Sequence, residues 1–173
     1  MRTRATRRHD RSRHAKSVAN LREGNDVIET NTTQKRVAVA REYVDRVFNG
    51  HNGELAREYF TPDVTFHALT VGTLTGVDAV VPVLVGLIDA LSDIHAEVQD
   101  VIASNDLVAM RQVVKARHTG TLLGIPATGG PLQWDAVDIY RINDAGKINE
   151  QWAFEDFAAI LTQAGGVKLP WAW

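Results

Sequence analysis

The chain has 173 residues and no cysteine, with 45% hydrophobic residues and a formal net charge of −2. This length is typical of one domain, and the hydrophobic fraction is sufficient for a packed core. Without cysteine, disulfides and thiolate metal sites are excluded, and no apolar run reaches the roughly 20 residues that a membrane-spanning helix needs.

The N-terminal segment is strongly basic. Residues 1–24 contain eight Lys or Arg against Asp10 and Glu23. Because it has almost no large apolar side chains to bury, we expect residues 1–31 to be a disordered basic tail and linker, followed by a single domain over residues 32–173. A passive extension is the simplest interpretation, and a basic arm or, in a eukaryote, a transit peptide stays open.

The same segment bears on partners and location. It carries no interleaved aromatic residues for base stacking, and no apolar stretch follows the basic residues as in a secretory signal. We therefore expect a cytoplasmic protein with no nucleic-acid partner and no membrane partner.

Two helices are predicted at the start of the domain. Thr32 or Thr33 caps the first, whose apolar residues recur at helical spacing until Gly50 ends it. Asn52 then caps a short second helix.

Three strands and a further helix follow. A short strand is predicted over residues 64–68 and a loop over 72–76. The helix over 79–91 is apolar nearly all round, so we expect it to be the central buried helix. Alternating apolar and polar residues then predict strands over 94–103 and 107–118.

The C-terminal part contains a loop and a hairpin. Four glycines and two prolines make the stretch 119–131 a loop, and loops at the open end of a sheet often contact ligand. Strands over 132–142 and 147–155 flank a tight turn, and Asp156 caps a last helix. Helices followed by four to five mostly antiparallel strands predict an α+β domain.

Two stretches of this half resemble the SnoaL-like polyketide cyclases and the related predicted ester cyclases. HTGTLLGIPATGGPLQW and VDIYRINDAGKINEQW match the loop and the hairpin of those families in order and spacing. The resemblance covers roughly residues 32–166. It implies the cone-shaped fold of the nuclear transport factor 2 superfamily, in which a curved, mostly antiparallel sheet wraps around N-terminal helices and leaves a deep pocket.

Asp138 is the most informative single residue. It interrupts a period-two apolar row over residues 132–142. A carboxyl group on an apolar face is desolvated, which raises its pKa toward the range useful for general acid and base catalysis. A structural carboxylate hydrogen-bonded to Trp134, Tyr140 or the backbone is the alternative.

Two histidines are further candidates. His118 lies on the apolar face of its strand directly before the Thr-Gly loop, and His67 is on the first strand, where the resemblance also favours a polar group. Each is equally open to a structural role. With Asp138 they have the composition of a metal triad, but three separate strands supply them without local ligand spacing, so no metal site is predicted.

The chain departs from the family at one position. In the aldol-type cyclases that it resembles, the acid/base aspartate aligns with Ala153, and alanine cannot transfer a proton. Glu155, two residues further on, is a candidate substitute, and a solvated position for Glu150 and Glu155 is the equally open alternative. Which face of this strand is inward stays open, because Ile148, Trp152 and Phe154 favour the opposite parity.

Together, the resemblance and the residues predict a cofactor-independent cyclase or isomerase that acts on a hydrophobic polyketide- or terpenoid-like intermediate. The catalytic candidates are Asp138, His118, His67 and Glu155. The expected substrate-binding residues are Tyr43, Phe66, Met110, Gln112, Trp134, Tyr140 and Trp152. A non-catalytic binding or scaffolding module, favoured by Ala153, and an epoxide or ester hydrolase are the alternatives. We also expect a homodimer, because an open sheet face and the C-terminal KLPWAW present apolar surface.

Overall fold

The computed structural model describes residues 31–168 and Pro170. Residues 1–30 of the expected disordered tail lie outside this range, as does most of the KLPWAW segment, whereas Asn31, the last residue of that expected segment, is helical. The first described element is a helix over residues 31–43 that continues as the π-helix η1 (Val44–Asn49). Within the described range, no helix is both long enough and apolar enough to cross a membrane.

The remaining elements confirm the α+β class. They are the 3₁₀-helix η2 (Gly53–Leu55), α2 (Ala56–Tyr59), β1 (Phe60–Ala68), β2 (Gly72–Thr75), α3 (Val77–Asp89), β3 (Leu91–Ser104), β4 (Leu107–His118), β5 (Pro131–Ile142), β6 (Ile148–Glu155) and α4 (Phe157–Gln163). The described residues thus form six strands, not four to five. The additional strand is β2, which lies where a loop was predicted and pairs with β1 from Thr65↔Thr75 to Ala68↔Gly72.

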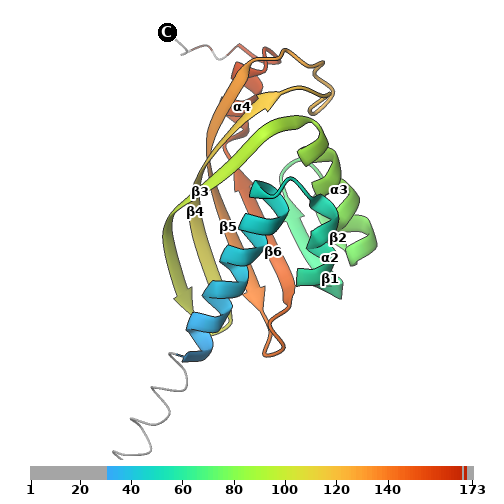
Figure 1. Cartoon of the computed structure of the whole chain (residues 1–173). Coiled ribbons are helices and arrows are strands. Elements are labelled where there is room, and N and C mark those ends of the chain that lie inside the picture. The colour runs from blue at the N-terminus through green and yellow to red at the C-terminus, as the bar shows by residue number, and fades with distance from the viewer. Residues whose placement is uncertain (1–30, 169, 171–173) are drawn as a thin grey trace, which may run out of the picture.

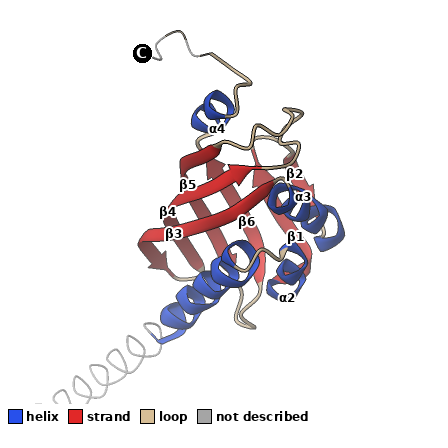
Figure 2. Cartoon of the chain, turned by 45° about the horizontal axis from the view of Figure 1, so that its top comes forward, coloured by secondary structure: helices blue, strands red, loops and turns tan. Residues whose placement is uncertain are grey.

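The strands form one curled, unclosed sheet in the order β2-β1-β6-β5-β4-β3. All neighbours are antiparallel except β1 and β6, which are parallel. The helix over residues 31–49 and α3 lie on one face of the sheet, and α4 lies beyond the end of β5 (Figures 1 and 2). This arrangement is the curved sheet around N-terminal helices that the resemblance implied.

The central helix is the first one. Its residues Ala40, Tyr43, Val44 and Val47 are fully buried. The Tyr43 ring contacts the aromatic rings of neighbouring elements at centroid distances of 5.5 to 5.8 Å. The prediction that α3 is buried all round is wrong, because α3 packs by one side only and its other side faces solvent.

A β-bulge in β6 determines which residues face the interior. Arg141 pairs with Glu150, but the next residue, Ile142, pairs with Ile148, so Asn149 is an extra residue on β6. An extra residue reverses the alternation of side chains along a strand. Ile148 and Gln151 are consequently both buried, although their positions differ in parity.

Candidate active site

The curled sheet and its helices enclose a cavity of about 210 Å³. Its walls come from η1, β1, α3, the loop after β4, β5, β6 and α4. The lining residues are Phe48, Phe66, Ala68, Thr70, Val71, Val83, Leu84, Gly86, Leu87, Thr121, Leu122, Leu123, Trp134, Asp138, Gln151, Ala153, Glu155, Phe157 and Ile160. Asp138 and Glu155 are the charged members of this described lining, and the rest are apolar or neutral.

Asp138 projects from β5 into this cavity and is only 6% exposed. Its two carboxyl oxygens accept hydrogen bonds from amide groups on the flanking strands. Gln112 Nε2 of β4 donates to Oδ2 at 2.7 Å, and Gln151 Nε2 of β6 donates to Oδ1 at 3.2 Å. Both donors favour the carboxylate, but burial outweighs them and raises the pKa of Asp138 to about 6.

Two tyrosines lie behind Asp138 in the core. The Tyr43 hydroxyl donates to Gln151 Oε1 at 3.3 Å, which orients the amide that donates to Asp138. The Tyr140 hydroxyl has no hydrogen bond of ordinary geometry to any described residue, although it is near enough to Asp138 for each group to shift the pKa of the other. Burial, and then the charge of Asp138, raise the pKa of both tyrosines, so both hydroxyl groups remain neutral.

Glu155 is the second carboxyl group of the cavity. It accepts a short hydrogen bond from the Trp134 indole Nε1. Burial, and then the negative charge of Asp138, raise the pKa of Glu155 to about 8, and the indole hydrogen bond opposes this shift only in part. At neutral pH the cavity therefore holds one carboxylate and one carboxylic acid.

Ala153 also faces the cavity, so the odd positions of β6 after the bulge are the inward ones. This resolves the parity that the sequence left open. Ala153 pairs directly with Asp138 across the ladder between β5 and β6. Residues paired in this way have Cβ atoms about 5 Å apart. Asp138 thus places a carboxyl group beside the position where the resembled cyclases carry their aspartate.

His118 is buried on the inward face of β4, as expected, but it is not near Asp138. Met110 is the β4 residue opposite Asp138, and His118 lies eight residues further along the same strand, which corresponds to roughly 26 Å of strand length. The His118 Nδ1 atom pairs with Thr128 Oγ1 at 3.2 Å, and Nε2 has no partner among the described residues. His118 belongs to the base of the 119–130 loop.

His67 and Trp152 lie on the outer face of the sheet, away from the cavity. The two rings stack at 5.3 Å, and the Arg141 guanidinium lies over the Trp152 ring at 5.7 Å from its centroid. His67 Nε2 contacts Glu150 Oε1 at 3.0 Å, and Nδ1 contacts Thr73 Oγ1 at 3.1 Å. The structure therefore does not bring these two candidates to Asp138, because Phe66 is the inward residue of β1 at this point.

The other expected binding residues fall into two groups. Phe66 and Trp134 line the main cavity, and Gln112 lines a small side cavity of about 20 Å³ that also contacts Asp138 and Glu155. Tyr43, Met110 and Tyr140 are completely buried in the core and do not appear in the lining. Met110 pairs with Asp138 across the ladder between β4 and β5, and Tyr43 is linked to Asp138 through Gln151.

Sequence reasoning missed Gln151 and the contribution of the helices. The inward position of Gln151 could not be predicted, because the bulge at Asn149 reverses the alternation of side chains along β6. The 119–131 loop, by contrast, was expected at a ligand site, and its residues Thr121 to Leu123 do line the cavity. Gly120 allows this placement, because a Cβ atom there would lie 2.8 Å from the Ala90 Cα, to whose carbonyl oxygen the loop is hydrogen-bonded.

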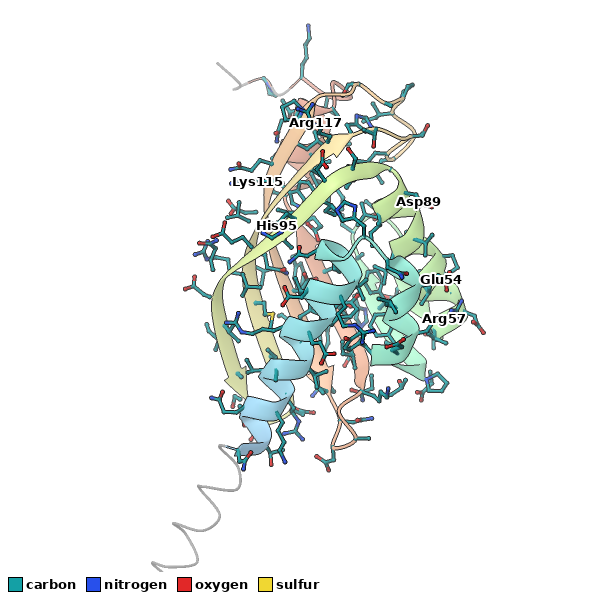
Figure 3. The ribbon with its side chains drawn as sticks, in the orientation of Figure 1. Glu54, Arg57, Asp89, His95, Lys115 and Arg117 are labelled. Atoms are coloured by element: carbon teal, nitrogen blue, oxygen red, sulfur yellow. The ribbon has the colours of Figure 1, made fainter. Side chains whose placement is uncertain are left out.

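No metal-binding group of three or more His, Cys, Asp or Glu side chains occurs among the residues that the structure describes. The charged side chains labelled in Figure 3, among them Arg57, Lys115 and Arg117, lie on the outside of the fold. The groups in the described lining that can take up or release a proton near neutral pH are the carboxyl groups of Asp138 and Glu155.

Comparisons with known proteins agree with this geometry. The family model described as SnoaL-like polyketide cyclase matches residues 38–164. Among solved structures, the chain is similar to AclR, a candidate hydroxylase from Streptomyces galilaeus, with 25% identity, a TM-score of 0.69 and coverage of 79% of this chain and 99% of AclR. A search of curated proteins finds no match.

Two further structures support the same fold. IdmH, a candidate polyketide cyclase from Streptomyces antibioticus, has 25% identity and a TM-score of 0.64, over 75% of this chain and 98% of IdmH. A candidate SnoaL-like polyketide cyclase from Jannaschia sp. CCS1 has 20% identity and a TM-score of 0.70, over 79% of this chain and 95% of the other.

Proposed function

Because the chain belongs to the SnoaL-like polyketide cyclase family, we propose that it is a cofactor-independent cyclase or isomerase in which Asp138 transfers a proton of a hydrophobic polyketide- or terpenoid-like substrate. The observation that carries this proposal is the buried Asp138 carboxyl group in a cavity whose described lining is mostly apolar. A general base is most effective when its pKa is close to the working pH, and burial brings the pKa of Asp138 to about 6.

The surroundings of Asp138 suit a base that acts repeatedly. Gln112 and Gln151 hold both carboxyl oxygens in place from the two flanking strands. An α-proton of a bound ketone passes to the Asp138 carboxylate, which leaves an enolate. In a ring closure the enolate carbon then attacks a second carbonyl group, and in an isomerisation the enolate is protonated at a different carbon. The aromatic walls, including Phe48 and Phe66, keep a flexible chain folded, which lowers the entropic cost of ring closure.

The replacement of the family aspartate by Ala153 supports a second candidate, a binding module without chemistry. Ala153 leaves one inward position of β6 without a proton-transferring group. Asp138 occupies the paired position on β5, which supports the enzymatic alternative. An experiment on the proton-transfer step separates the two.

The test uses 2-tetralone, an uncharged bicyclic ketone, as a probe of α-proton abstraction. The wild-type protein is expected to accelerate exchange of the α-protons with D₂O above the buffer rate, followed by ¹H NMR. Asp138→Asn keeps the volume but cannot take up the proton, so exchange should fall by roughly 10²–10⁴-fold. Glu150→Gln, on the outer face of the neighbouring strand, is the matched control and should retain the full rate.

The stability of Asp138→Asn distinguishes chemistry from structure. A purely structural carboxylate would leave Gln112 or Gln151 mispaired and cost about 1–3 kcal/mol, with exchange lost only in proportion to unfolding. Wild-type exchange no faster than buffer, or Asp138→Asn exchange equal to wild type, would reject the enzymatic proposal in favour of the binding module.

A further inference from the structure

We propose that Glu155 is the proton donor of the same site, held in place by the Trp134 indole, and that it works as the acid while Asp138 works as the base. This inference rests on the proposed function and assigns the second carboxyl group of the cavity. Glu155 lies diagonally from Asp138, since Asp138 pairs with Ala153 and Ala136 pairs with Glu155. Both carboxyl groups line the main cavity and its side cavity.

The two carboxyl groups differ in their hydrogen-bond donors, and this difference supports Glu155 as the acid and Asp138 as the base. Trp134 is 5% exposed and its indole Nε1 donates to Glu155 Oε2. This leaves the other Glu155 oxygen free of any described protein donor, so it can carry a proton toward a substrate. Asp138, in contrast, accepts donors at both oxygens, an arrangement that suits the ionised form.

The electrostatic surroundings support the same division. The described walls of the two cavities contain no Lys, Arg or His that would neutralise two carboxylates. The pKa of Glu155 is raised to about 8 and that of Asp138 to about 6, so the pair releases its protons in two separate steps. Two carboxyl groups with separated pKa values are the usual arrangement for an acid and a base in one site.

Glu155 also has a route for exchanging its proton with solvent. It lines an outer groove of about 370 Å³ together with His67, Leu69, Thr73 and Phe154. Ala68 and Ala153 line both this groove and the main cavity. Apart from Glu155, His67 is the titratable group in the described lining of the groove. Of the two carboxyl groups, Glu155 is therefore the one that lines both the main cavity and the outer groove.

The proposed step is balanced in atoms and electrons. The α-carbon–hydrogen bond of a ketone breaks and its proton goes to the Asp138 carboxylate. The electron pair forms the carbon–carbon double bond of an enol, and the carbonyl oxygen takes the proton of Glu155. The enol carbon then forms a bond to a second carbonyl carbon, whose C=O π bond breaks, and its oxygen takes the proton from Asp138. The first carbonyl group re-forms as the enol O–H proton returns to Glu155, so both carboxyl groups end in their starting states.

The indole of Trp134 reports on Glu155 without any substrate. In ¹H–¹⁵N spectra of the full chain, the Trp134 indole signal, assigned by its loss in Trp134→Phe, should shift in a step near pH 8. Glu155→Gln should abolish that step. Asp138→Asn should move the step to lower pH, because the negative charge of Asp138 is one cause of the raised pKa.

The 2-tetralone exchange assay tests the catalytic part. Glu155→Gln should lower the exchange rate by roughly 10²-fold. Trp134→Phe should move the alkaline limb of the pH–rate profile to higher pH, because the indole hydrogen bond lowers the pKa of Glu155. Glu155→Asp, with the carboxyl group one carbon shorter, should recover part of the rate.

Two results would overturn the inference. One is an indole signal that does not titrate near pH 8, or whose step survives Glu155→Gln. The other is a Glu155→Gln protein that exchanges 2-tetralone at the wild-type rate while Asp138→Asn does not, which would leave the proposed function intact and remove only Glu155. If Glu155→Gln and Asp138→Asn both exchange 2-tetralone at the wild-type rate, the proposed function itself is rejected.

Discussion

Glu150 and Glu155 lie on the same strand, five residues apart and on opposite faces of the sheet. On the outer face, Glu150 accepts hydrogen bonds from His67 at 3.0 Å and from Arg141 at 3.1 Å. Partial burial raises the pKa of Glu150, but these partners prevail and lower it overall. On the inner face, the neutral Trp134 indole is the one hydrogen-bond donor to Glu155 among the described residues, and burial and the like charge of Asp138 raise its pKa.

The contrast shows that the face of the strand, and not the residue type, determines the chemistry of these carboxyl groups. The outer network includes Arg141, which also pairs with Asp106 at 2.9 Å. Such exposed ion pairs contribute little to stability. They also keep the Glu150 carboxyl group ionised, so that it has no proton to donate near neutral pH. The inner pair is costly for the fold, and a protein keeps such groups where a function requires them.

The largest expected effect concerns stability as a function of pH. Because the folded protein raises the pKa of Asp138 and Glu155, it binds their protons more tightly than the unfolded chain does. Their contribution is fully present below the unfolded pKa values of about 4 and is lost as the pH rises through about 6 and about 8. A pKa that differs by one between the folded and the unfolded protein corresponds to about 1.4 kcal/mol, so the free energy of unfolding should fall by several kcal/mol.

Urea unfolding between pH 5 and pH 8.5 measures this decline. The double variant Asp138→Asn/Glu155→Gln should show a much flatter dependence, whereas Glu150→Gln should leave the wild-type slope unchanged. Parallel curves for the wild type and the double variant would mean that the inner carboxyl groups are not perturbed.

A smaller effect is expected for assembly. Val137 and Phe154 pair across β5 and β6 on the outer face and are 38% and 56% exposed, which leaves adjacent apolar side chains in contact with water. We expect a homodimer of twice the 19.1 kDa chain mass, and Phe154→Lys should weaken it by at least about tenfold, or about 1.4 kcal/mol. Sedimentation equilibrium showing a single chain at micromolar concentration would contradict this.

A still smaller effect is expected for His67. His67→Ala removes the contacts with Glu150, Thr73 and the Trp152 ring, which should cost about 1 kcal/mol of stability. The rate of 2-tetralone exchange should stay at the wild-type level, because the side chain does not reach the main cavity. A large loss of the 2-tetralone exchange rate at unchanged stability would show that His67 takes part in catalysis.

The smallest effect is expected for the N-terminal segment, which lies outside the described residues. Its composition offers almost no apolar surface to bury, so removal of residues 1–24 should leave the thermal midpoint nearly unchanged. Calorimetry of the truncated chain is the check. A drop of about ten degrees would show that the segment packs against the domain.

The fold was largely predictable because its strands alternate regularly. The even positions of β4 and β5 are inward, as their apolar residues indicated, and this placed Asp138 in the interior. The edge strand β2 was not predictable, since three of its four residues are exposed and the fourth is only partly buried. The amphipathic character of α3 was hidden by its nearly continuous apolar sequence, which resembles that of a buried helix.

The site was predictable only where it depended on one strand at a time. Whether His118 lies close to Asp138 depends on the register of β4 against β5. The alternation of apolar residues within each strand does not determine that register. Assigning Gln151 and Glu155 to the inner face required the bulge at Asn149, and no glycine or proline on β6 marks it. Long-range pairing, and not composition, decided both.

The pH dependence of 2-tetralone exchange by the wild-type protein tests the central claim most directly. If catalysis uses an ionised Asp138 and a protonated Glu155, the rate should rise through about pH 6, fall through about pH 8 and reach its maximum between them. Asp138→Asn should lose the rate at every pH, and Glu155→Gln should lose the alkaline limb. A wild-type rate that follows the buffer rate across this range would contradict the account.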